Sequence, residues 1–377
     1  MNEKSKKMNS DYKSASGQIG EKKTCERPGR RALTLLAGTI LGGFFTVGLI
    51  VFLFDPMFHY HKPWFGLKAV LTEKEYQVVG TLRHFDYDSL IAGSSVTENN
   101  NNAWFNEAFD CQAIKAARSY GGNGDLCYLL DIAFERQELK YVFYNIDPSS
   151  LTFYPELTYE ETGCPVYLYD RNPFNDVKYL FNKDILLEKI PYMIANSLMT
   201  DYDENLSYNW EKGKNFSVQG ALSHYERPEE VSEMMPERYL QEELTANIKR
   251  ISSVVQAHPD TEFIFFLPPY SMLFWDYTFR NGELEAYLYN ERELMKALLS
   301  FENVRFFCFQ SEEDIVMDLD QYMDTLHFRS EINYRMVEMM AAGQCEVTAG
   351  EEDRTTENIR KMVQQIEDTE IKRYYPE

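Results

Sequence analysis

The longest apolar run in the chain lies between residues 32 and 54 and contains no charged residue. As a helix, its 23 residues would span about 34 Å, enough for a bilayer core of about 30 Å. A cleaved signal peptide also has an apolar run after a basic start, but that run has roughly 7–15 residues and precedes a small-x-small site. Here the run is longer and ends in Phe52-Leu53-Phe54-Asp55-Pro56. The pattern favours an uncleaved membrane anchor over a signal peptide, and over a buried core helix because it has no polar face.

Downstream of Asp88, short apolar runs alternate with amphipathic stretches, which is the pattern of βαβ units around a parallel sheet. A turn is expected at residues 121–124, where three of four residues are glycine. The pattern therefore predicts an α/β domain with about five parallel strands. Its strands are predicted at residues 89–92, 112–116, 140–146, 262–267 and 304–309, and its helices at 99–110, 125–137, 229–257, 284–299 and 330–342.

The segment from residue 149 to about residue 227 interrupts this alternation. It is rich in Tyr, Asn, Asp and Pro and holds one helical patch near residues 184–198. Because it is too long for an ordinary connection, we interpret it as an insertion with its own structure, either a lid or a docking surface. Beyond Gly350, a polar stretch places three apolar residues at helical spacing, which predicts a C-terminal helix packed on the body through Ile359, Met362 and Ile366.

Charge is distributed unevenly along the 377 residues. Residues 1–31 hold nine Lys or Arg and four Asp or Glu, a charge of +5, so the rest must carry −27 to give the net −22. Such an acidic chain lacks the basic footprint of a nucleic-acid-binding protein. Because basic flanks stay in the cytoplasm, we expect a single-pass plasma-membrane protein whose N-terminus is cytoplasmic. The expected parts are a disordered tail at 1–31, a transmembrane helix at 32–54, an extracytoplasmic domain at 55–347 with its insertion, and a helical tail at 348–377.

Two further features of the outer part allow more than one interpretation. Phe58, Tyr60, Trp64 and Phe65 follow the anchor, where they form either an interfacial aromatic belt or the start of the folded core. Five of the six cysteines lie outside without CxxC spacing, which does not suggest zinc and leaves a disulfide unassigned.

Candidate chemistry is expected at the carboxyl ends of the strands, where ligands collect in parallel sheets. The first strand runs into Gly93-Ser94-Ser95, which could present a serine hydroxyl at the start of a helix or simply cap that helix. Of six histidines, only His327 follows the last predicted strand, three residues after Asp324. A carboxylate at this spacing can orient an imidazole, although the pair could equally form a local loop-to-cap contact.

Two segments together resemble a known family. DSLIAGSSVTEN resembles the first block of SGNH/GDSL-type hydrolases, and YMDTLHFRSEINYRMVEMM resembles their last block. The resemblance covers roughly residues 86–342 apart from the insertion, and implies a three-layer α/β/α, flavodoxin-like SGNH fold. It places the nucleophile on Ser95, the acid on Asp324 and the base on His327.

The other family blocks match less closely. The second-block glycine would be Gly121 or Gly122, and the third block retains only Asn145, so Gly122 and Asn145 are the candidate oxyanion donors. Ser94 stands where the common pattern has Asp, which is more similar to the membrane-anchored branch of DltD and the alginate O-acetylation proteins.

The resemblance implies an extracytoplasmic serine esterase or O-acyltransferase that acts on a cell-wall polymer or exopolysaccharide, commonly beside a multi-spanning membrane O-acyltransferase. The alternative is a non-catalytic SGNH-fold scaffold that binds a polymer or a membrane acyltransferase. Tyr270 and Trp275 could stack on sugar rings, although packing is the commoner role of such aromatics. We expect no cofactor and no metal, because His84-x-Asp86-x-Asp88 and Asp318-x-Asp320 are incomplete ligand sets.

Overall fold

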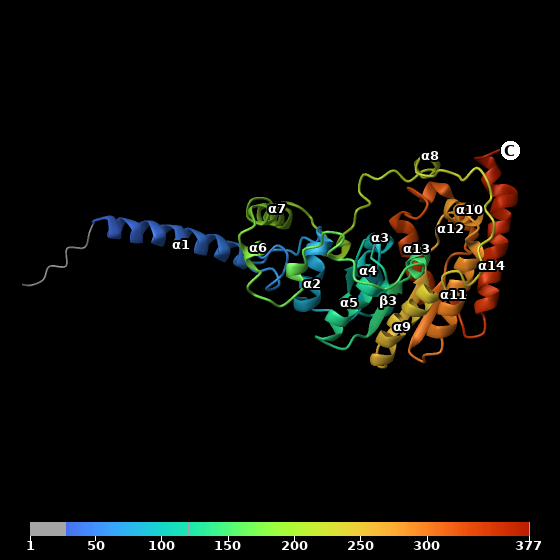
Figure 1. Ribbon diagram of the computed structural model, residues 1–377, viewed down its shortest axis with the longest axis horizontal. Coiled ribbons are helices and arrows are strands. Elements are labelled where there is room, and N and C mark those ends of the chain that lie inside the picture. Colours follow the sequence, from blue (N-terminus) through green and yellow to red (C-terminus); the bar gives the residue numbers. More distant parts are fainter. Residues whose placement is uncertain (1–27, 120, 377) are drawn as a thin grey trace, which may run out of the picture. The chain divides into compact units, whose positions relative to one another are not determined.

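The computed structural model describes residues 28–119 and 121–376, in two compact units that divide between Thr46 and Val47. Helix α1 (Pro28–Phe54) crosses this division (Figure 1). From Gly29 to Phe54 it is long and apolar enough to cross a membrane, with a mean hydropathy of 2.2 in its most apolar stretch. Large apolar side chains of its first part, such as Leu35 and Phe45, are exposed.

The second unit, from Val47 onward, is built on one six-stranded sheet with the order β2-β1-β3-β4-β5-β6. Five strands pair in parallel, which confirms the predicted α/β class. The sixth is a two-residue strand antiparallel to β5, and it is too short to leave a sequence pattern. The strands are β1 (Ser89–Gly93), β2 (Ala113–Ala117), β3 (Tyr141–Asn145), β4 (Glu262–Leu267), β5 (Val304–Cys308) and β6 (Glu346–Val347).

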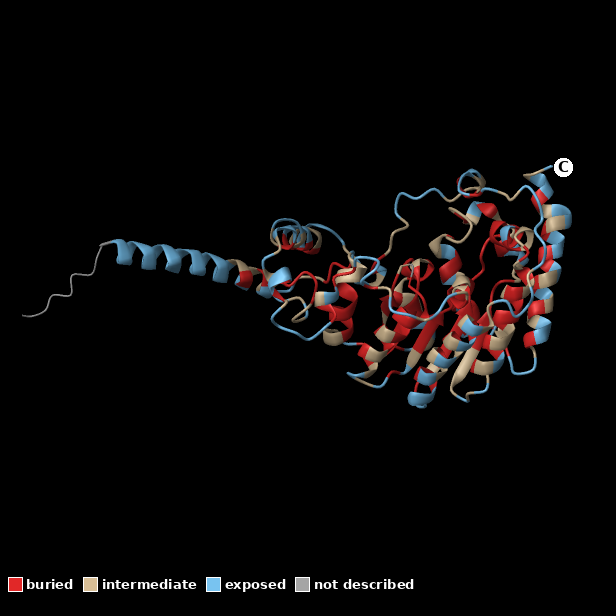
Figure 2. Ribbon diagram, in the orientation of Figure 1, coloured by how far each residue is buried: buried red, intermediate tan, exposed pale blue. Residues whose placement is uncertain are grey.

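Helices cover both faces of the sheet. On one face α5, α9 and α11 pack side by side, and on the other α4 packs against α13, as right-handed crossovers require (Figure 1). The strands between them are almost entirely buried (Figure 2). The principal helices are α2 (Lys74–His84), α3 (Ser95–Glu98), α4 (Asn102–Phe109), α5 (Asn123–Phe134), α9 (Gln241–Ala257), α10 (Met272–Arg280), α11 (Leu284–Leu298), α12 (Glu313–Val316) and α13 (Ser330–Ala341).

Two helix predictions are wrong at their N-terminal ends. The helix predicted at 99–110 begins at Asn102, where the Asn101 side chain caps it by accepting from the Ala103 N–H. The helix predicted at 229–257 begins only at Gln241. The N–H groups of Ser232 and Met235 instead donate to the carbonyls of Arg280 and Gly282, at the C-terminal end of α10. Residues 229–236 are irregular, and a turn at 237–240 leads into the helix.

The insertion consists of short helices and turns rather than a separate sheet. Its helices are α6 (Val177–Leu180), α7 (Ile190–Met199) and α8 (Val218–Ser223), with a π-helical turn at Ile185–Lys189. The helical patch predicted near 184–198 is therefore present. A second small apolar cluster joins α7 to the segment after α1, with Met193 packed beside Phe58, Ala69 and Val70.

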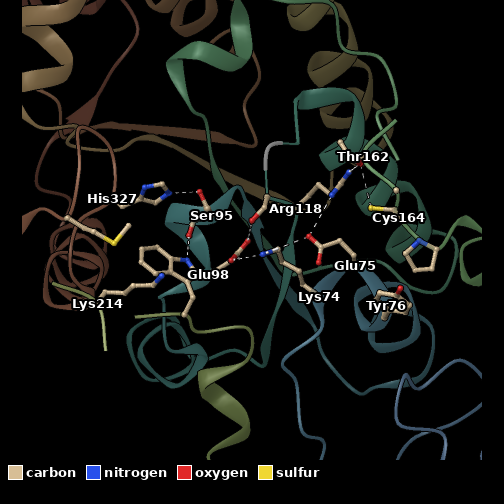
Figure 3. Close-up of a pocket in the computed structure, with 15 residues that line it drawn as sticks. Lys74, Glu75, Tyr76, Ser95, Glu98, Arg118, Thr162, Cys164, Lys214 and His327 are labelled. Carbon is tan, nitrogen blue, oxygen red and sulfur yellow. Dashed lines mark hydrogen bonds and ion pairs between the residues drawn. The ribbon is translucent and has the colours of Figure 1, made fainter. Parts of the chain in front are cut away.

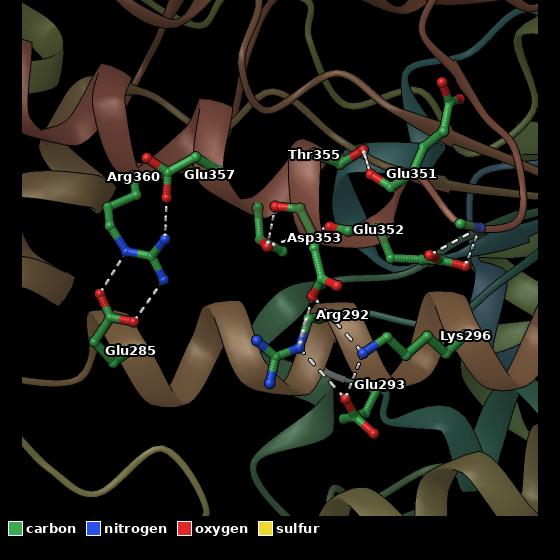
Figure 4. Close-up of polar contacts among 12 residues, drawn as sticks. Glu285, Arg292, Glu293, Lys296, Glu351, Glu352, Asp353, Thr355, Glu357 and Arg360 are labelled. Carbon is green, nitrogen blue, oxygen red and sulfur yellow. Dashed lines mark hydrogen bonds and ion pairs between the residues drawn. The ribbon is translucent and has the colours of Figure 1, made fainter.

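The C-terminal helix α14 (Glu352–Gln365) packs on α11 through its predicted apolar stripe, with Ile359, Met362 and Ile366 buried. Ion pairs flank this contact (Figure 4). Arg360 binds both carboxylate oxygens of Glu285 at 2.8 and 2.7 Å, while Asp353 lies 3.6 Å from Arg292. Cys111, Cys127, Cys164, Cys308 and Cys345 are free thiols.

Candidate active site

A sharp turn at the end of β1 places Ser95 at the start of α3. The strand ends at Gly93, Ser94 is extended, and the helix begins at the next residue. A Cβ atom on Gly93 would lie 2.1 Å from Thr97 Oγ1 and 2.8 Å from Asn145 Cβ, so only glycine lets α3 fold back over the strand ends.

Ser95, His327 and Asp324 form a continuous hydrogen-bonded series (Figure 3 shows the first two). Ser95 Oγ lies 2.8 Å from His327 Nε2, and His327 Nδ1 lies 2.7 Å from Asp324 Oδ2. A proton on Nδ1 donates to Asp324 and leaves Nε2 free to accept the serine proton. The structure thus brings together the three residues predicted as nucleophile, base and acid, whereas a local loop contact accounts only for the Asp324–His327 pair.

Asp324 is held in its ionised form. Burial by itself would raise its pKa, but the His327 ring and the backbone N–H groups of His327 and Leu326 together lower the pKa below its ordinary value. The second carboxylate oxygen accepts both backbone N–H groups at 2.8 Å. The same carboxylate therefore stabilises the loop at residues 324–327 and orients the imidazole.

Ser95 and His327 open into a cavity of about 580 Å³ (Figure 3). Its walls come from α2, α3, the turn after β2, the His327 loop and two stretches of the insertion. The residues that line it are Lys74, Glu75, Tyr76, Ser95, Glu98, Arg118, Ser119, Thr162, Gly163, Cys164, Pro165, Trp210, Lys214, Met323 and His327.

Charges of both signs are built into the cavity wall. Glu98 is 1% exposed, accepts from Lys74 Nζ at 2.9 Å and from Ser119 Oγ at 2.8 Å, and has a pKa raised by burial despite those contacts. Arg118 is also buried, 3.7 Å from Glu75 and 4.9 Å above the Tyr159 ring. This wall suits a polar ligand that carries hydroxyl groups better than an aliphatic chain.

Trp210, which no sequence pattern distinguishes, contacts both Ser95 and His327. Its indole Nε1 donates to the Ser95 carbonyl at 3.0 Å, and its ring meets the His327 ring edge to face at 5.2 Å. Trp210 lies within the aromatic-rich insertion, where no spacing distinguishes it from packing residues. The insertion therefore completes the site.

Neither predicted oxyanion donor is among the described residues that line the cavity. Gly122 precedes α5 and lies beneath the Phe153 ring, which a Cβ atom would meet at 2.5 Å. Asn145 ends β3, and its amide donates to Thr97 Oγ1 at 3.2 Å and to Asp147 at 3.4 Å. Asn145 thus lies within the strand, and its side chain contacts Thr97 and Asp147 near the turn that carries Ser95, outside the cavity lining.

The predicted sugar-stacking residues Tyr270 and Trp275 are buried, with exposed fractions of 2% and 0%. Trp275 lies in the core beside Phe274. The Tyr270 hydroxyl donates to Asp147 at 2.5 Å, and this carboxylate also accepts from Ser94. Burial raises the pKa of Asp147 despite these bonds. The two aromatics thus pack the core, and Tyr270 and Asp147 support the residue before the nucleophile.

The candidate metal-ligand patterns have other roles. Asp86 pairs with Lys62 and Arg136, and Asp318 caps a turn by accepting from the Asp320 N–H at 3.1 Å. Within residues 28–119 and 121–376, no three His, Cys, Asp or Glu side chains are grouped to hold a metal ion.

Comparison of the chain with protein-family models finds no match, and comparison with curated proteins finds none either. The chemistry assigned to the site therefore depends on the geometry of Ser95, His327 and Asp324.

Proposed function

We propose that the chain is a membrane-anchored, extracytoplasmic serine esterase or O-acyltransferase that acts on a cell-wall polymer or exopolysaccharide. The observation that carries this proposal is the Ser95–His327–Asp324 geometry at the mouth of a polar cavity. The resemblance of the two sequence segments to SGNH/GDSL hydrolases supports it independently.

The geometry supports an acyl-enzyme mechanism. Ser95 Oγ attacks the acyl carbonyl while His327 Nε2 takes its proton, and Asp324 stabilises the resulting imidazolium. His327 then protonates the departing alcohol oxygen as the acyl C–O bond breaks. Water or a sugar hydroxyl next attacks the acyl-enzyme and gives up its proton to His327, which passes a proton to Ser95 Oγ as the acyl–serine bond breaks.

Transfer to an acceptor is preferred over hydrolysis because the chain resembles the membrane-anchored O-acetylation branch and carries a helix fit to span a membrane. A multi-spanning membrane O-acyltransferase would then be the partner that supplies the acyl group. Adding a sugar acceptor to the acyl-enzyme distinguishes the two reactions, because transfer yields an acylated sugar where hydrolysis yields free acid.

The second candidate function is a non-catalytic scaffold that binds a polymer or a membrane acyltransferase. One observation favours it, namely that neither Gly122 nor Asn145 lines the cavity.

The test uses the full-length protein with a fluorophosphonate and an activated acetyl ester. We expect wild type and the control Ser253→Ala, on the outer surface of α9, to label and to turn over the ester. Ser95→Ala should do neither. Absence of labelling and turnover in wild type would favour the scaffold and end the enzymatic proposal.

A further inference from the structure

An apolar surface projects from the insertion beside the end of the anchor. It consists of six exposed side chains on and around α6 and α7, referred to here as the α6–α7 face. They are Phe174 (87% exposed), Val177 (54%), Leu187 (68%), Tyr192 (49%), Leu198 (67%) and Met199 (84%). The surfaces of soluble monomeric proteins rarely expose so many large apolar side chains in one short segment, which indicates that the face is an interaction site.

Hydrogen bonds tie this segment to the residues that leave the anchor. The Tyr179 hydroxyl donates to Asp55 at 2.7 Å, and Asp176 accepts from the Tyr60 hydroxyl at 3.0 Å. On α7, Ser197 Oγ accepts from the Lys68 N–H at 2.6 Å. The face is therefore fixed to the point where the chain emerges from α1, and α6 and α7 lie at that end of the unit (Figures 1 and 2).

One contact shows how deep the segment reaches. The Phe181 ring lies against Gly48, where a Cβ atom would be 3.6 Å from it. Gly48 precedes the end of the helix by six residues, or about 9 Å along its axis. If Phe54 marks the outer boundary of the hydrocarbon, Phe181 lies below that boundary, at the depth where aromatic side chains anchor interfacial helices.

The net charge of residues 174–199 is also compatible with contact to a lipid surface. Residues 174–199 hold three lysines and three acidic residues and carry no net charge, within an outer part that carries −27. The acidic remainder would be repelled by anionic headgroups, so this neutral segment is a surface that can approach them. Trp64 and Phe65, which are 41% and 68% exposed, pack against Phe52 and Phe54 at the end of α1 and add exposed aromatic rings there.

We propose that residues 174–199 form a second membrane contact, in which the α6–α7 face lies in the headgroup and outer acyl region of the bilayer that α1 spans. This inference rests on the proposed role of α1 as an anchor. Because the same insertion supplies Thr162–Pro165 and Trp210 to the cavity, two attachment points would hold the cavity at a fixed height and orientation above the membrane.

The test places the full-length protein in protein-free nanodiscs that contain a phospholipid with a photoactivatable diazirine in its acyl chain. Peptide mass spectrometry should find lipid adducts in residues 174–199 and in the anchor. The control segment 229–240 also exposes Val231, Met234 and Tyr239, by 55%, 62% and 61%, and should remain unlabelled.

Paired variants sharpen the result. Leu198→Glu with Met199→Glu should reduce labelling of residues 174–199 by about fivefold or more while the anchor stays labelled. Val231→Glu with Met234→Glu should leave the labelling of residues 174–199 and of the anchor unchanged. The inference is overturned if the anchor is labelled and residues 174–199 are not. That result would also be expected if a protein, rather than lipid, covers the α6–α7 face in the native membrane. An unlabelled anchor would instead contradict the membrane-anchor proposal itself.

Discussion

One carboxylate oxygen of Asp324 accepts a hydrogen bond from the His327 ring, and the other accepts from the backbone N–H groups of Leu326 and His327. Asp324→Asn keeps the shape but puts an amide where the carboxylate accepts the ring proton, so the imidazole loses both its tautomer and its counter-charge. We expect kcat for an activated acetyl ester to fall by about 10³- to 10⁴-fold. Asp318→Asn, in a turn that does not involve the triad, is the control, and a loss below about tenfold for Asp324→Asn would contradict the assigned role.

Trp210 positions the nucleophile without reacting. Trp210→Phe removes the hydrogen bond to the Ser95 carbonyl but keeps an aromatic ring beside His327. We expect kcat to fall by about tenfold with little change in KM, because misplacement of reacting groups slows the chemical step more than it weakens binding. Trp104→Phe is the matched control, since Trp104 packs against Tyr334. An effect confined to KM would make Trp210 a substrate-binding residue instead.

Lys115 is a buried cation in β2 whose Nζ donates to the carbonyls of Glu98 and Ser207 at 2.7 and 2.5 Å. Burial lowers its pKa from 10.5 to about 7, against the opposing pull of Glu98 and Asp203. The unfolded chain therefore binds one more proton than the folded chain between about pH 7 and 10.5, so this group makes stability rise with pH across that window.

Lys115→Met should abolish this contribution. Thermal unfolding of both proteins from pH 7 to 10 should show wild type gaining stability relative to the variant as the pH rises. Parallel stability curves would mean that Lys115 does not titrate in this range.

At the level of elements, the strands could be predicted because each is a short apolar run that the sheet buries. The prediction for β4 matches residue for residue, and β1 differs by one residue. The first part of the helix predicted at 229–257 is wrong because the N–H groups of Ser232 and Met235 bond to carbonyls at the C-terminal end of α10, and such distant pairing leaves no local pattern.

The residues of the candidate site also divide into those that the sequence predicts and those that it does not. Ser95 was predictable because it comes two residues after β1, and the Asp324–His327 pair because it lies in the segment that follows β5, the last parallel strand. A parallel sheet brings the carboxyl ends of its strands to one edge. Trp210 and Asp147 were not predictable, since their positions depend on the path of the insertion and on contacts across the turn. Gly122 lies beneath the Phe153 ring and Asn145 lies at the end of β3, and neither is among the described residues that line the cavity. Their role as oxyanion donors stays a prediction.

The α11–α14 contact offers a comparison between burial and ion pairing. Ile359 is fully buried, whereas Arg360 beside it is 38% exposed in its pair with Glu285. Ile359→Ala should cost about 2–5 kcal/mol through lost burial and a residual cavity. Arg360→Ala should cost no more than about 1 kcal/mol, because solvent screens a partly exposed ion pair. Chemical denaturation of the three proteins measures both, and equal losses would contradict the ranking.

For the whole molecule, the charge division sets the expected topology. The basic residues Lys22, Lys23, Arg27, Arg30 and Arg31 precede an uncharged span, and the acidic remainder of the chain, with a charge of −27, follows it. Since basic flanks are retained in the cytoplasm, protease added to intact cells should cleave the exposed segment 229–240 and spare an N-terminal tag. Replacing the five basic residues with Gln should reduce this asymmetry, because the retention signal is lost while the span is unchanged. A tag digested in wild-type cells would reverse the topology and place Ser95 on the cytoplasmic side, away from any extracellular polymer.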